Sequence, residues 1–414
     1  MPLGAGETFC QQQVDDVHAA AARGGAPILP HHRAAVRVKP DARSTAAGVR
    51  WRPTGRDSDV AFPPLPPTGL EDPYMTARPL IVRCGAFGDM VMLTTLMRVV
   101  SARYGSPVDV VSSGGWTPPL LMREPTLGHL QMVTSRKTPY LLCPSQWALV
   151  RWLRGRGRGP VYLGDIDPEM RALLERGGVH PDDIVARDPA GEDAPVLWPD
   201  RWLELGQRDP VRGYPTVDVD VAPLRFPRLI VTDDERADLS RWLADTGLHG
   251  PVVLLQPGNK RTHKRGRLMT ADHPKHWDAA HWATVARAVL DSLPEAHVVL
   301  CGSPPEHPLL EDIRAAAGQH PRVFNGANAL PIPRLLALIE RAHSMVSVDT
   351  GPAHAAAALG CPLVVLFGAA PPGKWRPIGP GRIVALGGER GAASRVSDLA
   401  PVQVVDAWRQ LHAG

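Results

Sequence analysis

The sequence lacks any apolar run near the roughly 18 residues that a membrane-spanning helix needs. Its five cysteines are scattered and form no Cys-x-x-Cys pair, so we expect neither a disulfide framework nor a cysteine metal site. The first residues, MPLGAGETFCQQQ, lack the basic and then apolar order of a signal peptide. A net charge of +4 is too small to indicate nucleic-acid binding. These absences favour a soluble cytoplasmic protein, and 414 residues suffice for two domains.

Residues 1–76 show little hydrophobic periodicity and are rich in alanine, arginine, proline and glycine. They end in AFPPLPPTGLEDPY, a composition typical of an extended linker. We predict a disordered N-terminal arm here. Two alternatives stay open: an artefact of start-site choice, since Met75 stands just before the first expected strand, and an arm that binds a partner or a membrane surface.

The rest of the chain alternates between expected strands and helices, which indicates parallel α/β sheets. We predict a Rossmann-like domain over residues 77–245, a second over 246–395, and a closing amphipathic helix within 396–414 that Asp398 would cap. Residues 115–210 are harder to interpret, and LLCP and PVYLGDI are the strand candidates there. In such folds ligands bind outside the carboxyl ends of the strands, here between two facing domains.

The stretch SVDTGPAHAAAALG at 347–360 predicts a buried strand, a turn at Thr350 and Gly351, and an alanine-rich helix with Pro352 in its first turn. Free N–H groups and the positive end of the helix dipole would then point beyond the strand, which suits a phosphate. A well-capped turn without a ligand is the alternative interpretation of this stretch alone.

A second strand–turn–helix junction reads RCGAFGDMVMLTT, in which Gly85 and Gly88 shape the turn and Asp89 opens a helix. Asp89 is either an acid favoured by the helix dipole or a carboxylate that takes a proton from a sugar hydroxyl. The spacing is not Gly-x-Gly-x-x-Gly, and no acid follows about twenty residues on, which argues against a nicotinamide or flavin cofactor.

Two further candidates follow strands of the second predicted domain. Lys275 stands beside a strand end, after the basic loop 259–272, where an ammonium could meet a diphosphate. The loop itself is expected to be solvated. Glu306, in CGSPPEHPLLEDI, is placed to bond ribose hydroxyls or to serve as a helix N-terminal acid.

Taken together, IVRCGAFGDMVMLTT, PKHWDAAHW, GSPPEHPLLEDI, RAHSMVSVDTGPAHAAAALGCPLVVLFG and KWRPIG resemble glycosyltransferase family 9, the bacterial heptosyltransferases. The resemblance spans roughly residues 79–412. It implies a GT-B architecture, with two Rossmann-like domains facing each other across a cleft that holds donor and acceptor. It also implies inverting, metal-independent transfer of a heptose from a nucleotide donor, usually ADP-heptose, to an acceptor like the lipopolysaccharide core.

The resemblance also implies roles for individual residues. Asp89 matches the general base, Lys275 the lysine at the donor phosphate, and Glu306 the acid at the nucleoside ribose. The remaining matches all lie in the VDTGPAH stretch: Asp349 near the donor sugar, Thr350 and Gly351 as backbone donors at the diphosphate, and His354 one helical turn further on. A helix N-terminus and Lys275 could stabilise a departing diphosphate without magnesium.

The implied partners are a nucleotide-sugar donor, which is a co-substrate and not a cofactor, and a glycan or lipid-linked glycan acceptor. We expect no nucleic acid, and at most peripheral contact with the cytoplasmic face of the inner membrane. The chain departs from the family at Leu96, where proline is common, and at 369–372, which read AAPP in place of Pro-Thr-Asp-Pro. The basic loop is also long. Donor identity therefore stays open.

Three alternatives remain. Asp165-Ile166-Asp167, after an apolar strand, imitates the metal-binding Asp-x-Asp of GT-A enzymes, and VDVDV at 217–221 repeats the imitation. A non-catalytic sugar-nucleotide-binding protein is the second, although the intact Asp89 argues against it. The third is a GT-B relative that uses a UDP or GDP donor, such as an epimerase.

Overall fold

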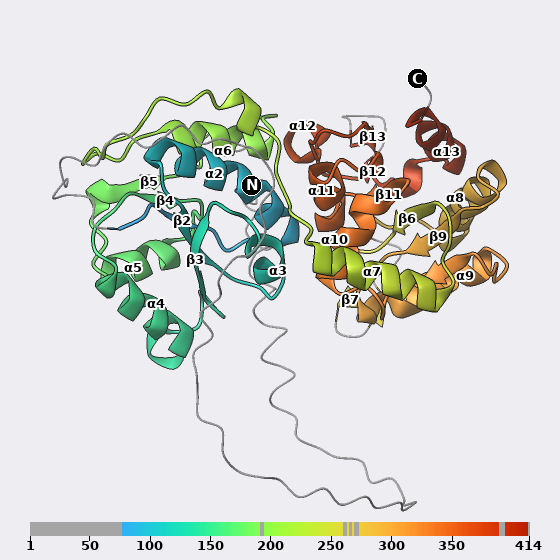
Figure 1. Cartoon of the computed structure of the whole chain (residues 1–414), viewed down its shortest axis with the longest axis horizontal. Coiled ribbons are helices and arrows are strands. Elements are labelled where there is room, and N and C mark those ends of the chain that lie inside the picture. Colours follow the sequence, from blue (N-terminus) through green and yellow to red (C-terminus); the bar gives the residue numbers. More distant parts are fainter. Residues whose placement is uncertain are drawn as a thin grey trace, which may run out of the picture. The chain divides into compact units, whose positions relative to one another are not determined.

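Two parallel β-sheets form the frame of the chain, as a computed structural model shows (Figure 1). The structure describes residues 77–190, 194–259, 263–264, 267–268, 273–388 and 394–412. The predicted arm at 1–76 and most of the basic loop at 259–272 therefore lie outside the described residues. Within that loop the structure places a short antiparallel pair, β7 (His263–Lys264) and β8 (Arg267–Leu268).

The first sheet has five strands in the spatial order β3-β2-β1-β4-β5, all parallel. They are β1 (Leu80–Val82), β2 (Val108–Ser112), β3 (Leu127–Met132), β4 (Val161–Leu163) and β5 (Ile184–Ala186). Side chains alternate between its two faces. Ile81 packs toward α2 (Phe87–Tyr104) and α6 (Trp198–Gln207), whereas Leu80 and Val82 pack toward α4 (Pro144–Gly155) and α5 (Pro168–Arg176).

The second sheet has six parallel strands in the order β10-β9-β6-β11-β12-β13, the doubly wound order of a dinucleotide-type fold. They are β6 (Val252–Gln256), β9 (His297–Leu300), β10 (Val323–Asn325), β11 (Ser344–Val348), β12 (Leu363–Phe367) and β13 (Ile383–Gly387). One face carries α7 (Asp233–Thr246), α10 (Ile332–Arg341) and α11 (Gly351–Ala358). The other carries α8 (Ala279–Ser292), α9 (His307–Ala316) and α13 (Pro401–Gln410).

One apolar core continues from the first sheet into the second because α2 packs against α11. Helix α7 packs against α10, so it covers the second sheet although it precedes the predicted boundary at residues 245 and 246. All strands in each sheet are parallel, so the turns that follow β1 and β11 lie at the carboxyl edges of their sheets. These two turns contain the predicted site residues.

Two local predictions were wrong. LLCP forms no strand. Tyr140–Leu142 is a 3-10 turn, η1, and Pro144 begins α4. Proline is favoured in the first turn of a helix. Asp398 does not cap the closing helix but accepts hydrogen bonds from the backbone N–H groups of Ser394 and Arg395. Among the described residues, no helix has the length and apolar character needed to cross a bilayer.

Candidate active site

Asp89 lies in the first turn of α2, directly beyond the carboxyl end of β1. One carboxylate oxygen accepts a hydrogen bond from Nη2 of Arg83 at 2.8 Å, and the other from the backbone N–H of Ala86 at 2.8 Å. The side chain is 14% exposed. Each carboxylate oxygen has a second lone pair, so this carboxylate is held from two sides and can still accept a proton.

Glycines make the contact between the first turns of α2 and α11 possible. A Cβ on Gly88 would lie 2.9 Å from Cδ2 of His354, and a Cβ on Gly351 would lie 2.6 Å from Cδ1 of Phe87. Both distances are shorter than real Cβ contacts. Gly85 has a different reason, since its Cβ would lie 2.4 Å from Cβ of Asp89. Gly351, predicted only as a phosphate-binding turn residue, therefore also serves helix packing.

Lys275 and Asp349 form an ion pair at the edge of the second sheet. Nζ of Lys275 donates to the Asp349 carboxylate at 2.7 Å and to its carbonyl oxygen at 2.6 Å. The side chains are 23% and 9% exposed, so this pair is largely enclosed. Described residues use two of the three N–H donors of the ammonium, and the third can serve an anionic ligand.

His354 lies one turn into α11 and is buried. Burial lowers the pKa of its imidazole, while the negative charges of Asp349 and Asp89 act to raise it and Lys275 acts to lower it. These effects connect residues from both sheets, so the structure brings Asp89, Asp349, Lys275 and His354 into one group. The imidazole is neutral at pH 7.

No side chain in the described part of the structure caps the start of α11. Thr350 stands at the N-cap position in extended conformation, but its hydroxyl lies 3.3 Å from Oγ of Ser347 and does not cap the helix. Thr350, Gly351 and His354 thus lie together where the sequence predicts them. Backbone N–H groups without a cap are the feature that suits an anion.

Glu306 follows β9, a neighbour of β6 in the second sheet. One of its carboxylate oxygens accepts hydrogen bonds from the backbone N–H and the hydroxyl of Ser303, both at 2.7 Å. This is the helix N-terminal role that the sequence left as an alternative. Its predicted ribose contact stays a prediction.

Arg83 is the functional candidate that sequence reasoning missed. Its guanidinium bonds Asp89 and also Oδ1 of Asp165 at 3.2 Å, and it lies over the rings of Trp198 and Trp202. Arg83 therefore holds one carboxylate oxygen of Asp89 in place. The sequence shows only that Arg83 ends β1, just ahead of the glycine turn. That position does not reveal which side chains Arg83 contacts.

The Asp-x-Asp imitation is explained by the same arginine network. Asp165 is buried, accepts from Arg83 and from the backbone N–H of Cys84, and lies 3.7 Å from Arg136. Asp167 pairs with Arg136. Carboxylates that bind a cation must present free lone pairs to it. Within the described ranges, no group of three or more His, Cys, Asp or Glu side chains is arranged to hold a metal ion.

A tryptophan contact joins α6 to α12 (Pro372–Trp375), which follows β12. The rings of Trp198 and Trp375 lie 5.5 Å apart, and Arg187 lies 5.1 Å from the Trp198 ring.

The loop that precedes α12 departs from the family pattern at 369–372. A Cβ on Gly368 would lie 2.2 Å from the carbonyl oxygen of Pro274, so that loop starts beside Lys275.

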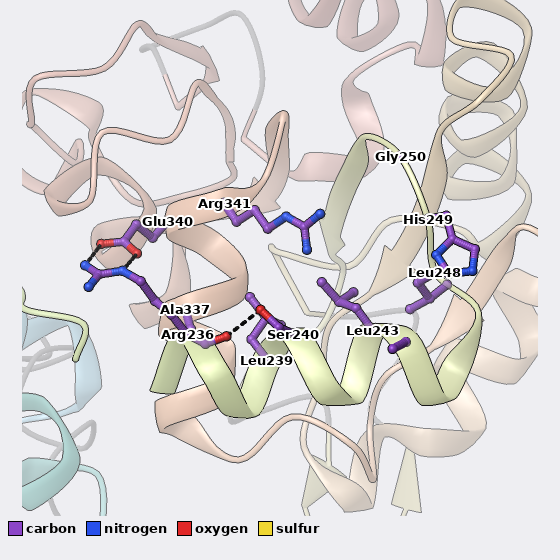
Figure 2. Close-up of a pocket in the computed structure, with 11 residues that line it drawn as sticks. Arg236, Leu239, Ser240, Leu243, Leu248, His249, Gly250, Ala337, Glu340 and Arg341 are labelled. Atoms are coloured by element: carbon purple, nitrogen blue, oxygen red, sulfur yellow. Dashed lines mark hydrogen bonds and ion pairs between the residues drawn. The ribbon is translucent and has the colours of Figure 1, made fainter. Parts of the chain in front are cut away.

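A separate groove of about 580 Å³ lies between α7 and α10 (Figure 2). Its floor is apolar, with Leu239, Leu243 and Leu248, and its rim carries the ion pair of Arg236 and Glu340. None of the predicted site residues lines it. We therefore assign the chemistry to the residues between α2 and α11.

Comparison with known proteins points to a family of glycosyltransferases. Residues 235–403 match the model of glycosyltransferase family 9 (heptosyltransferase). Lipopolysaccharide heptosyltransferase 2 of Salmonella typhimurium is 26% identical over 312 residues, which cover 71% of this chain and 83% of that protein. This chain is a glycosyltransferase that is similar to family 9 over residues 235–403.

Solved structures show the same fold for the glycosyltransferase. The ADP-heptose lipopolysaccharide heptosyltransferase II of E. coli aligns with a TM-score of 0.63 and 23% identity, over 81% of this chain and 98% of that one. An E. coli heptosyltransferase solved with ADP aligns with a TM-score of 0.58 and 18% identity, over 81% and 99%. The predicted GT-B architecture is confirmed. The roles of the individual site residues stay predictions.

Proposed function

We propose that this glycosyltransferase moves a heptose from ADP-heptose to an acceptor like the lipopolysaccharide core, with inversion and without a metal ion or other cofactor. One observation carries the proposal. The Asp89 carboxylate, the uncapped start of α11 and the Lys275–Asp349 pair lie together around His354. The names of the relatives, and the ADP in one solved neighbour, support the choice of donor.

In the proposed reaction, an acceptor hydroxyl oxygen attacks the anomeric carbon of the donor sugar. The bond from that carbon to the diphosphate breaks, and its electron pair leaves on the phosphate oxygen. The hydroxyl proton passes to Asp89, which Arg83 and the Ala86 N–H hold in position. The first turn of α11 and Lys275 stabilise the charge that develops on the diphosphate.

Neutral His354 has a positioning role in this proposal. Its ring fills the contact between Gly88 and the first turn of α11, so it sets the separation of base and diphosphate site. Glu306 is proposed to contact the nucleoside ribose and Asp349 the donor sugar. We place the reaction in the cytoplasm, with peripheral contact at the inner membrane, because the proposed acceptor is linked to a lipid.

The test is a transfer assay with ADP-heptose, UDP-sugar and GDP-sugar donors, each with EDTA and with added magnesium. We expect transfer from ADP-heptose alone, unchanged by EDTA, and an NMR coupling constant that shows the inverted anomer. Transfer that needs magnesium would contradict the proposed metal-free mechanism. Retention at the anomeric carbon would exclude Asp89 as the base of a single displacement.

A UDP- or GDP-sugar donor is the second candidate. It is favoured by one observation: the AAPP loop at 369–372 replaces the family pattern, and the turn before it packs on Pro274, next to Lys275. A preference for such a donor in the same assay would keep the fold and the proposed base but change the donor. Nucleotide binding without any transfer would instead favour a non-catalytic binding protein.

A further inference from the structure

One segment of the first sheet's half of the chain carries basic residues and no acid. Between Glu124 and Asp165 the sequence has six lysines and arginines and neither aspartate nor glutamate. Two of the six are used inside the fold, since Arg136 pairs with Asp165 and Asp167 and Arg156 pairs with Asp109. Of the remaining four, Arg151 and Arg154 lie on α4.

The outer face of α4 is basic. Trp147, Arg151 and Arg154 follow one another at helical spacing of four and three residues, and all three are exposed. In the part of the chain that the structure describes, Arg151 has no partner, and Arg154 donates only to the backbone carbonyl of Arg176. Exposed Lys137 also lacks a partner among the described residues.

Apolar side chains project from the turn that precedes this helix. Leu141 is 78% exposed, Leu142 72% and Trp147 40%. Nε1 of Trp147 donates to the carbonyl oxygen of Tyr140 at 2.6 Å, so the indole and the two leucines belong to one surface. Arg176 lies over the Tyr140 ring at 4.3 Å and adds a positive charge. We call Leu141, Leu142, Trp147, Arg151 and Arg154 the α4 surface.

The neighbouring helix does not cancel this charge. Helix α5 packs against α4 and carries Glu169 and Glu175, but Arg171 and Arg176 balance them. Figure 1 shows α4 and α5 side by side on the first sheet. Exposed leucines and a tryptophan whose indole N–H is bonded, bordered by arginines, match the composition of a surface that lies in a bilayer interface.

We propose that the α4 surface docks the glycosyltransferase onto a bilayer rich in anionic phospholipid. This deepens the peripheral membrane contact in the proposed function. Turn η1 follows β3, whose carboxyl end shares a sheet edge with the carboxyl end of β1, where Asp89 lies. Nε2 of Gln146 on α4 donates to the carbonyl oxygen of Arg136, and the ion pairs Arg136–Asp165, Asp165–Arg83 and Arg83–Asp89 continue from there to the proposed general base. An acceptor anchored in the docked membrane would present its sugar to that edge.

The test is co-sedimentation of the full chain with phosphatidylcholine vesicles, with and without phosphatidylglycerol. We expect binding only to the anionic vesicles, weakened by salt. Arg151→Glu should weaken it about thirtyfold, the effect of removing one charge and adding its opposite at roughly 1 kcal/mol per charge. Leu141→Ser with Leu142→Ser should weaken it at least about tenfold.

Matched controls are Arg241→Glu on α7 and Val402→Ser on α13, which are also exposed and should bind like the parent chain. Equal binding to both vesicle types, or unchanged binding in both test variants, would overturn the proposal. A stable dimer or a protein complex that the double serine variant abolishes would also overturn the proposal, because the surface would then bind protein and not lipid. Transfer to a soluble acceptor fragment should be unchanged in the variants. If the parent chain transfers no sugar at all, the proposed function is refuted, but the vesicle binding still tests the α4 surface.

Discussion

Nζ of Lys275 lies 2.7 Å from a carboxylate oxygen of Asp349 and 2.6 Å from the carbonyl oxygen of the same residue. The loop before α8 is thereby tied to the end of β11 just where the first turn of α11 begins. In the proposed function a donor diphosphate would bind the same ammonium through its remaining N–H group. Donor binding would then be linked to the stability of this edge of the sheet.

Replacing Lys275 with methionine should destabilise the protein, because the largely buried Asp349 carboxylate loses its partner. We expect a loss of about 3 kcal/mol in the free energy of unfolding, measured by urea denaturation. Lys137→Met is the control, since Lys137 is exposed and has no partner among the described residues. Adding Asp349→Asn should restore most of the stability but not the affinity for ADP. A stable Lys275→Met chain would show that the pair contributes little.

Asp89→Asn should lower kcat by about 10²- to 10⁴-fold, the usual contribution of a general base. The asparagine oxygen can still accept the Ala86 N–H, so we expect the fold to be kept and the Kd for ADP to change little. Steady-state kinetics and a thermal shift with ADP measure the two effects separately. Full activity in this variant would remove Asp89 from the mechanism.

Gly351→Ala should destabilise the contact between α2 and α11, because the new methyl group would lie 2.6 Å from Cδ1 of Phe87. We expect a cost of about 1 to 3 kcal/mol in the free energy of unfolding. Phe87→Leu in the same chain should recover part of it, which a double-mutant cycle would detect. Gly115→Ala is the control, since nothing lies within 4 Å of its Cβ position. Equal effects at Gly351 and Gly115 would contradict the close approach.

His354 should make stability depend on pH below neutrality. Burial lowers the pKa of His354 from its ordinary value of 6.5, so in the window below 6.5 the folded state binds fewer protons than the unfolded state. The stability is fully present above that value and is lost as pH falls through the window. Urea denaturation from about pH 7.5 to about pH 5 should show a steeper loss for the parent chain than for His354→Gln. His343 and His412, whose pKa values are also lowered, are common to both proteins and cancel. Parallel curves would contradict the buried imidazole.

Local pattern was sufficient to predict most of the regular structure. Apolar runs such as VVLLQ and SMVSV predict buried strands, and α8, α10 and α11 lie where periodicity and alanine content place them. It failed at LLCP, where two exposed leucines imitate a strand although Pro144 starts a helix. The α4 surface could not be predicted from the sequence either. Whether an apolar residue is exposed depends on which other parts of the fold cover it.

Local pattern in the sequence predicts the two parallel α/β halves, the glycine turns that follow strands, and the candidates Asp89, Lys275, Glu306, Thr350 and Gly351. The candidates Asp349 and His354 follow only from the resemblance to glycosyltransferase family 9. The locally predicted features depend on neighbours within a few positions, where hydrophobic period and turn chemistry act. Tertiary contacts are needed to see that Arg83 holds Asp89, that Gly88 packs on His354, and that Asp165 is paired with arginines. Such contacts join residues far apart in the chain, and the packing of α2 against α11 selects them.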